Sequence, residues 1–221
     1  MSGIPGPEAS PHTPARTARR PRLRLVDLWS IAAVLAGYLI GSVDFGVILP
    51  RLWGVDIYDV GSGNPGTTNV LRSLGRVAAA AVLAGDILKG FAAAVLGYWA
   101  GGEAAGFAAG WAAVLGHCYP IWHRFRGGKG VATAGGMVLW LSPVLGAILL
   151  PAWGLITAVL KKASVASLAL AVALVPGLWI AGHRGWSLVW AGAASVLILY
   201  RHKDNIARLL AGSEHTIEES P

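Results

Sequence analysis

Residues 77–100 read VAAAAVLAGDILKGFAAAVLGYWA, an apolar run in which only Asp86 and Lys89 carry charge. About 20 apolar residues in a helix are enough to cross the hydrocarbon core of a bilayer. Because the two charges stand three residues apart, a helix places them on one face, where they can pair and turn away from lipid. The run therefore predicts a membrane-spanning helix with an internal ion pair, whose role is either structural or catalytic.

Similar apolar runs continue on both sides of this stretch. They cover residues 28–50, 104–122, 132–147, 148–160, 164–182 and 186–200. The two runs between 132 and 160 are short and contain Pro143 and Pro151, so they suggest a tight hairpin or a partly re-entrant element. Hydrophobic residues make up 55% of the chain and charged residues only 13%, against about 25% charged residues in soluble domains. We expect an all-α integral membrane protein with about seven transmembrane helices.

The distribution of positive charge predicts the orientation of these helices. Lysine and arginine crowd into the loops on one side, whereas the opposite loops contain only Arg184. The crowded side carries Arg51, Arg72, Arg76, Arg124, Arg126, Lys129, Lys161, Lys162, Arg201, Lys203 and Arg208. The positive-inside rule places that side and the C-terminus in the cytoplasm and the N-terminus outside. The basic segment 1–27 conflicts with this orientation, because by the same rule it would place the N-terminus in the cytoplasm.

Three regions follow from these patterns. Residues 1–27 are expected to form a disordered basic tail, residues 28–214 a seven-helix membrane domain with the functional site, and residues 215–221 a C-terminal tail. The net charge is +7, and the basic residues lie between the apolar runs. This arrangement favours anionic lipid headgroups or phosphate-bearing substrates over nucleic acid as binding partners. The single cysteine, Cys118, excludes a disulfide within the chain and is expected to be a buried thiol.

The first of three polar loops, residues 61–69, reads GSGNPGTTN. Its glycines permit positive φ angles, so that successive backbone N–H groups can converge on an anion. Ser62 adds a hydroxyl donor, and Arg72 adds a planar guanidinium suited to phosphate. The pattern is neither a Walker loop nor a dinucleotide fingerprint. It predicts a phosphate site, and the alternative is a loop merely rich in turn-forming residues.

The second polar loop joins GHCYP at residues 116–120 to GGKGVAT at residues 127–133. Lys129 lies among glycines just before an expected helix, whose N-terminus favours a phosphate group. The alternative is a positive charge that only anchors the loop at the membrane surface. His117 either packs at a helix end or contacts the ligand directly.

The third polar loop begins with HKDNI at residues 202–206. His202 and Asn205 are three residues apart and share one face of a helix, and His202 can act as a general base or donate to phosphate. An amphipathic surface helix is the alternative. Nearby, Ser164 and Ser167 begin a span, and either hydroxyl can face the site or bond back to its own helix. No histidines are spaced to bind a metal, and we expect neither a metal nor a cofactor.

Together the loops predict an interfacial site for two phosphate groups, and at this point the chain resembles a known family. The patterns Gly-Ser-Gly-Asn-x-Gly-x-Thr-Asn, Gly-His-x-x-Pro with Gly-Gly-Lys-Gly-Val-Ala-Thr, and His-x-x-Asn with Gly-x-Glu occur in this order. They resemble the bacterial acyl-phosphate:glycerol-3-phosphate acyltransferase family (PlsY) over about residues 28–214. Asp86-x-x-Lys89-Gly90 is similar to the family pattern as well. Asp44, Lys203 and Thr67 depart from it, standing where the family usually has Pro, Arg and Ala.

The resemblance implies a multi-pass enzyme of the bacterial cell (inner) membrane with a cytoplasmic active site. It implies transfer of a fatty acyl group from acyl phosphate to the 1-hydroxyl of glycerol 3-phosphate, without a covalent acyl-enzyme. The products are lysophosphatidate and phosphate, formed in phospholipid biosynthesis. The implied partners are acyl phosphate, glycerol 3-phosphate, membrane lipid and, as a candidate, the soluble enzyme that makes acyl phosphate. The acyl chain is expected in a groove between spans that is open to lipid.

The resemblance also implies roles for single residues, carried over by motif position. Acyl phosphate is expected at Gly61, Ser62, Gly63, Asn64 and Asn69. Glycerol 3-phosphate is expected at Arg72, Lys129, Ser167, His202 and Asn205, with Ser164 as the alternative to Ser167. His202, Lys129 and Asn69 are the expected catalytic residues, and His117, Gly127, Gly128, Asp86, Lys89 and Glu214 are expected to support them. The hydroxyl proton goes either to His202 or to a substrate phosphate oxygen.

Two other functions fit parts of the sequence. A transporter or channel for a phosphorylated solute would share the spans and basic loops. Such proteins often show internal repeats and place polar sites near the bilayer midplane, whereas here the polar residues gather at one face and no repeat is evident. A related membrane enzyme with another acceptor is the second alternative.

Overall fold

A computed structural model describes residues 25–218, and these form only helices and their connections. The elements are α1 (Leu25–Gly41), α2 (Phe45–Leu52), α3 (Thr67–Cys118), the short 3-10 helix η1 (Ile121–His123), α4 (Val131–Leu141), α5 (Pro143–Leu160), α6 (Ala163–Ile180), α7 (Trp186–Arg201) and α8 (Lys203–Leu210). The all-α prediction is confirmed. Most of the segment predicted to be a disordered tail, residues 1–24, lies outside the described residues, and its last three residues already belong to α1.

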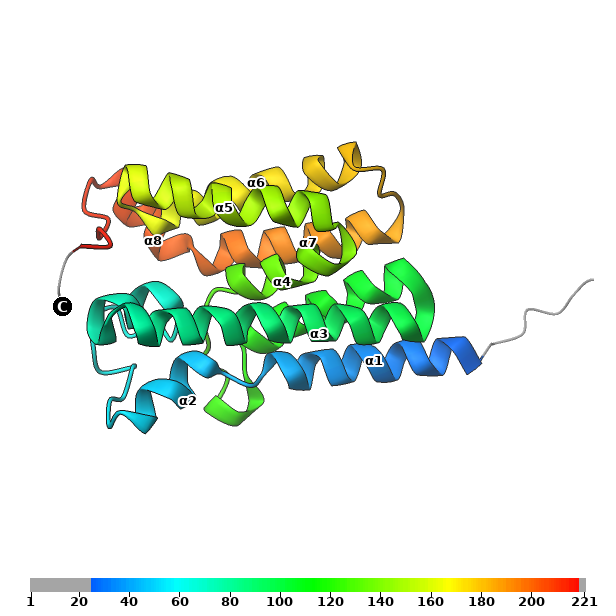
Figure 1. Cartoon of the computed structure of the whole chain (residues 1–221), viewed down its shortest axis with the longest axis horizontal. Helices are drawn as coiled ribbons and strands as arrows, with labels where there is room; N and C mark the ends of the chain where they lie inside the picture. The colour runs from blue at the N-terminus through cyan, green and yellow to red at the C-terminus, as the bar shows by residue number, and fades with distance from the viewer. Residues whose placement is uncertain (1–24, 219–221) are drawn as a thin grey trace, which may run out of the picture.

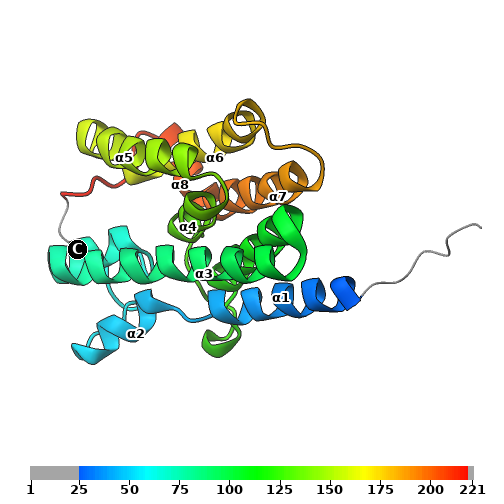
Figure 2. The same ribbon diagram turned by 45° about the vertical axis from the view of Figure 1, so that its right-hand side comes forward.

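The helices pack in two layers (Figure 1). One layer contains α1 and α3, the other contains α5, α6 and α7, and α4 lies between the layers. The turned view shows the same order, with α2 and the C-terminus at one end and the start of α1 at the other (Figure 2). Functional groups at the first end are thus gathered from distant parts of the sequence.

Helix α3 is a hairpin of two long helical arms, and a further non-helical position at Gly75 (φ 84°) separates its first turns from the first arm. Its backbone is non-helical at Gly101 and Gly102, and Gly102 has a φ of 78°. A residue without a Cβ atom adopts this conformation without strain, so the chain can reverse there. The two arms correspond to the predicted spans 77–100 and 104–122.

The structure divides two of the predicted runs differently. The run 28–50 is not one helix, because the chain breaks after Gly41 and Asp44 starts α2 by accepting a hydrogen bond from the Gly46 N–H (3.1 Å). The division between the runs 132–147 and 148–160 lies instead at Ser142, where α4 ends and Pro143 begins α5. Proline fits the first turn of a helix, where its missing N–H costs nothing. Hydropathy alone detects neither break, because apolar residues continue across both.

Several helices are long and apolar enough to cross a membrane. Among the described residues these stretches are Leu28–Leu52, Thr67–His123, Pro143–Leu160 and Ala163–Ile180. Thr67–His123 contains the α3 hairpin and so supplies two arms, while α4 and α7 are shorter apolar helices. Together these segments account for the predicted apolar runs.

Helices α3 and α4 approach closely at Gly90. A Cβ atom there would collide with the carbonyl oxygen of Thr133. We therefore expect Gly90→Ala to destabilise the protein by about 1–3 kcal/mol through overpacking, which corresponds to a fall in Tm of roughly 2–12 °C at this chain length. Thermal unfolding in detergent measures it. Gly154→Ala in α5 is the matched control, since a Cβ atom there meets nothing within 4 Å. An equal fall in both variants would contradict the prediction.

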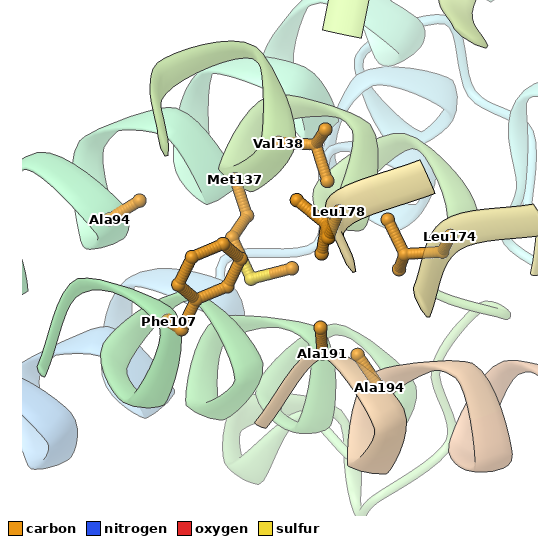
Figure 3. Packing of buried hydrophobic residues seen from close by; sticks show 8 residues of the cluster. All are labelled: Ala94, Phe107, Met137, Val138, Leu174, Leu178, Ala191 and Ala194. Carbon is orange, nitrogen blue, oxygen red and sulfur yellow. The ribbon is translucent and has the colours of Figure 1, made fainter. Parts of the chain in front are cut away.

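A buried apolar cluster joins the two layers (Figure 3). We name it the central cluster, and its buried members are Ala94, Phe107, Met137, Val138, Leu174, Leu178, Ala191 and Ala194. They come from α3, α4, α6 and α7. This cluster closes the interior between the layers and forms one boundary of the pocket described next.

Candidate functional site

An elongated pocket collects residues from all three polar loops. Its polar lining lies at or near helix ends and contains Ser62, Asn64, Thr67, Thr68, Asn69, Arg72, Lys129, His202, Asn205, Arg208 and Glu214. Its apolar lining lies further along the helices and contains Leu83, Ile87, Val138, Leu149, Leu150 and Leu174. The pocket therefore joins a polar end to an apolar end.

Helix N-termini converge on the polar end. Helices α3, α4 and α6 begin at Thr67, Val131 and Ala163, and each of these residues lines the pocket. The first N–H groups of a helix have no partner within the helix, and they carry partial positive charge. Three such termini around one pocket form a site for anions even before the side chains are considered.

Lys129 lies in a chain of polar contacts across this end. Its Nζ donates to Asn205 Oδ1 (2.5 Å), and Asn205 Nδ2 donates to Glu214 Oε1 (2.6 Å). Arg208 Nε donates to the other Glu214 oxygen (2.9 Å). Burial lowers the pKa of Lys129 to about 8, and the charges of Arg208, Arg201 and Arg72 act in the same direction while Glu214 opposes them. An incoming phosphate would favour the charged amine.

His202 is buried at the junction of α7 and α8. Its Nδ1 lies 2.8 Å from the carbonyl oxygen of Ile198. Because a carbonyl only accepts, Nδ1 must carry the hydrogen, which leaves the Nε2 lone pair as the acceptor. Burial lowers the pKa of His202 to about 4, aided by the nearby charge of Lys129. The imidazole is therefore neutral near pH 7.

Asn69 holds the first polar loop in shape. Its Oδ1 accepts from the Ser62 N–H (2.9 Å), and its Nδ2 donates to the Val60 carbonyl (3.0 Å). Gly61 has a φ of 55° and packs so tightly against Asn69 that a Cβ atom would collide with it. Ser62 and Asn64 line the pocket, whereas Gly61 and Gly63 are absent from the lining and shape the loop.

Gly127 and Gly128 are held between two side chains. The Gly128 N–H donates to the His117 carbonyl (3.1 Å), and a side chain at this position would collide with the His117 imidazole. Arg201 donates from Nε to the Gly128 carbonyl (3.0 Å) and from Nη2 to the Gly127 carbonyl (2.7 Å). Arg201 was not among the predicted site residues, because the sequence indicated only that it is one of the basic loop residues. Its position directly before His202 was the available signal.

A buried ionic group borders the pocket. Lys89 Nζ is 2.7 Å and His117 Nδ1 is 3.4 Å from Asp86 Oδ1. Lys89 Nζ also donates to the carbonyl of Val43 (2.9 Å), between α1 and α2. The predicted pairing of Asp86 and Lys89 is confirmed. Asp86 and His117 line the pocket, but Lys89 and the buried Asp44 are absent from its lining.

Ser164 and Ser167 both line the pocket, but in different settings. Ser167 Oγ donates to the Ala163 carbonyl (2.9 Å) and accepts from Trp153 Nε1 (3.0 Å). Its hydroxyl hydrogen is therefore used within α6. Ser164 lies one turn earlier, in the first turn of α6, where the free N–H groups are. Cys118 is buried, as expected.

Residues of the predicted C-terminal tail, 215–221, also contact the site. His215 lines the pocket, and Arg72 Nη1 donates to the Thr216 carbonyl (3.4 Å). The Ile217 N–H donates to the Lys161 carbonyl (2.8 Å). These contacts use mainly backbone groups, which leave no periodic pattern in the side chains, so no motif pointed to them.

Comparisons with known proteins agree with this geometry. The family model described as glycerol-3-phosphate acyltransferase matches residues 31–212. A glycerol-3-phosphate acyltransferase of Hyphomonas neptunium is 43% identical over 85% of this chain and 91% of its own length. One of Rhizobium meliloti is also 43% identical, over 86% of this chain and 93% of its own length.

Solved structures give the same result. The crystal structure of PlsY (YgiH), an integral membrane glycerol 3-phosphate acyltransferase, is similar in its glycerol 3-phosphate form with a TM-score of 0.81 and 40% identity, over 85% of this chain and 94% of that one. Its lysophosphatidic acid form gives a TM-score of 0.79 and 39% identity, over the same shares of the two chains.

Proposed function

We propose, on the premise that this chain belongs to the glycerol-3-phosphate acyltransferase family, that its acyl donor is acyl phosphate and its acceptor is the 1-hydroxyl of glycerol 3-phosphate. The chain is a multi-pass integral membrane enzyme that forms lysophosphatidate. In the proposed step the hydroxyl oxygen forms an ester bond with the acyl carbon, the bond from that carbon to the phosphate oxygen breaks, and phosphate leaves. The observation that carries the proposal is one continuous pocket that joins a cationic end to an apolar end.

The polar end offers separate positions for two phosphate groups. We assign the acyl phosphate to the first polar loop and the N-terminus of α3, where Ser62, Asn64 and Thr68 line the pocket. We assign the phosphate of glycerol 3-phosphate to the opposite wall, where Lys129 and Arg208 stand. Both positions combine helix N–H groups with charged or hydroxyl donors, as phosphate sites in proteins do.

Several residues in this assignment act through others. Asn69 supports the first loop by its hydrogen bonds to the backbone, and Arg201 and His117 hold the glycines that precede Lys129. We place Asn205 on the glycerol 3-phosphate wall because it accepts from Lys129, and Arg72 beside it because Arg72 reaches from α3 to the C-terminal segment at the Thr216 carbonyl. Ser164 suits this wall better than Ser167, because the hydroxyl hydrogen of Ser167 already goes to a carbonyl.

The acyl donor makes a covalent intermediate unnecessary. A carboxylic–phosphoric anhydride is already activated, so the protein needs to align the hydroxyl with the carbonyl carbon and stabilise the developing negative charge. Free N–H groups at the starts of α3, α4 and α6 supply positive partial charge around this position. The reaction therefore depends on placement of the two substrates.

We propose that the hydroxyl proton goes to a phosphate oxygen of the donor and that His202 orients the hydroxyl. A general base works best when its pKa lies near the operating pH. With a pKa of about 4, His202 is a weak base, whereas the phosphate group of the donor gains negative charge and becomes more basic as its bond to the acyl carbon breaks. The Nε2 lone pair of the neutral imidazole can still accept a hydrogen bond from the hydroxyl.

The same proposal includes orientation in the bacterial cell membrane. Helices α2 and α8 lie at the same end of the helix bundle (Figure 1). The polar lining of the pocket and most of the lysines and arginines belong to the loops and helix ends there, and the positive-inside rule places this end in the cytoplasm. The N-terminus then lies outside. Two single variants, Ser2→Cys and Ser213→Cys, each in a Cys118→Ala background, would test it. Only the Ser2→Cys variant should react with an impermeant maleimide added to intact cells, and labelling of Ser213→Cys alone would reverse the orientation.

Product analysis with defined donors tests the reaction. Purified protein is given palmitoyl phosphate or palmitoyl coenzyme A, each with and without glycerol 3-phosphate. We expect lysophosphatidate and an equal amount of phosphate only with palmitoyl phosphate and glycerol 3-phosphate together. Turnover with the thioester alone as donor would overturn the proposed donor. No product from folded protein, but uptake of glycerol 3-phosphate into proteoliposomes, would support the transporter alternative.

The pH dependence of KM for glycerol 3-phosphate follows from Lys129. Its pKa of about 8 lies below the usual lysine value, so the free enzyme loses this positive charge as the pH rises through about 8. We expect KM for glycerol 3-phosphate to rise above that pH, while KM for acyl phosphate changes less. Initial rates between pH 6 and 9.5 measure both constants. A KM for glycerol 3-phosphate that is flat to pH 9.5 would contradict the assignment.

A further inference from the structure

The apolar end of the pocket closes on the central cluster. Val138 of α4 and Leu174 of α6 line the pocket and are also buried members of that cluster. Figure 3 shows Leu174 beside Leu178, with Val138 above Leu178 and Met137 and Phe107 further along. Val138 and Leu174 are 2% and 4% exposed. They therefore form a packed floor below the apolar groove.

The depth of this groove can be estimated along α6. Ser164 lines the pocket in the first turn of α6, and Leu174 lies ten residues later in the same helix. At 1.5 Å per residue the two levels are about 15 Å apart. An extended alkyl chain advances about 1.3 Å per carbon, from a bond of 1.52 Å and an angle near 111°. The groove between these levels thus takes about twelve extended carbons.

We propose that Leu174 and Val138 set the length of acyl chain that this enzyme prefers, by stopping the methyl end of the chain. The inference rests on the proposed function, since it takes the groove as the site of the donor's acyl chain. A chain that reaches the floor packs each of its methylene groups against the groove wall, and these van der Waals contacts contribute favourably to binding. A longer chain must bend or leave the groove, and so loses part of this contribution.

Ala171 lies one turn above the floor on the same helix. It lines the pocket and is 5% exposed. A leucine at this position would occupy the groove three residues, or about 4.5 Å, closer to the polar end. The usable depth would fall by about three or four carbons. By contrast, Val172 is 65% exposed and lies on the outer surface of α6. Its side chain therefore does not contact the acyl chain in the groove.

A competition assay tests the proposal. Wild type and the variants Leu174→Ala, Val138→Ala, Ala171→Leu and Val172→Ala each receive an equimolar mixture of acyl phosphates with 10 to 18 carbons and glycerol 3-phosphate. Mass spectrometry of the lysophosphatidates gives ratios of kcat/KM. Because ratios are measured within one sample, partial loss of folded protein does not change them.

We expect Leu174→Ala and Val138→Ala to shift the preferred length by about two carbons toward longer chains, and Ala171→Leu to shift it by about four carbons toward shorter ones. The ratio between lengths two carbons apart should change by at least roughly tenfold, the size of effect that one methylene group has in a closed pocket. Val172→Ala should keep the wild-type profile.

Two outcomes separate the inference from the function on which it rests. If wild type uses acyl phosphates and all four variants keep its length profile, the chain leaves the groove above the floor, and the inference is overturned while the function stands. If wild type uses no acyl phosphate of any length, the proposed function itself fails. A shift in Val172→Ala equal to that in Leu174→Ala would also overturn the inference.

Discussion

Lys89→Met is expected to lower the free energy of unfolding by about 3–5 kcal/mol, the usual effect of removing one partner of a buried ion pair. The side chains of Lys89 and Asp86 are 3% and 2% exposed, and their charged atoms are 2.7 Å apart. Methionine fills a similar volume but leaves the Asp86 carboxylate without its main counter-ion. The Val43 carbonyl loses its hydrogen bond as well. Denaturant or thermal unfolding in detergent measures the loss.

The double variant Asp86→Asn/Lys89→Met separates charge imbalance from poor packing. It removes both charges, and we expect it to recover most of the stability that Lys89→Met loses. Leu88→Met is the matched control for packing, because Leu88 is adjacent and 63% exposed toward the outside of the helix bundle. If the double variant is as unstable as Lys89→Met, the ion pair is not the cause. The hydrogen bond to Val43 would then be the main contribution of Lys89.

The Asp86–Lys89 pair shows what the sequence can predict. Two charges in an apolar helix have few stable arrangements, because each unpaired charge is costly inside a membrane. Spacing then decides whether they can meet. The same reasoning predicted that the three polar loops lie together although they are far apart in sequence, and residues of all three line one pocket. The length and polarity of the helices and the predicted side of each loop were enough to predict both the ion pair and the grouping of the loops.

Other parts of the site depend on backbone groups, which the sequence does not reveal. Arg201 acts by donating to two glycine carbonyls, and Asn69 by bridging two backbone groups of its loop. The break before α2 depends on one carboxylate, Asp44, in a run that remains apolar on average. In such cases the partner is defined by the path of the chain and not by residue type, so no motif points to it.

The apolar groove was expected in outline, but its residues could not be named from the sequence. Leu174 contacts the pocket and Val172 faces outward, yet both are aliphatic residues of α6. Lipid and an acyl chain have the same polarity, so a helix that faces both has no hydrophobic face to distinguish them. Only the packing of helices α3, α4, α5 and α6 around the pocket distinguishes the positions that line it from those that face outward.

Lys129→Met is expected to lower kcat/KM for glycerol 3-phosphate by about 30- to 1,000-fold, since loss of a buried charged contact costs about 2–4 kcal/mol and each 1.36 kcal/mol is tenfold. Stability should change in the opposite sense. The pKa of Lys129, about 8, lies below the unfolded value, so keeping the amine charged destabilises the fold at pH 7. This cost is full below pH about 8 and disappears as the pH rises toward the unfolded pKa.

Methionine removes the charge, and Lys129→Met should therefore be at least as stable as wild type at pH 7 while nearly inactive. That combination distinguishes a substrate-binding lysine from a structural one, whose loss would lower activity and stability together. Lys203→Met is the matched control, because Lys203 is exposed, two residues from Asn205, and absent from the pocket lining. Steady-state kinetics and thermal unfolding are measured on the same preparations. Equal kinetic losses in both variants would indicate that overall positive charge, and not contact with the acceptor, is what the enzyme requires.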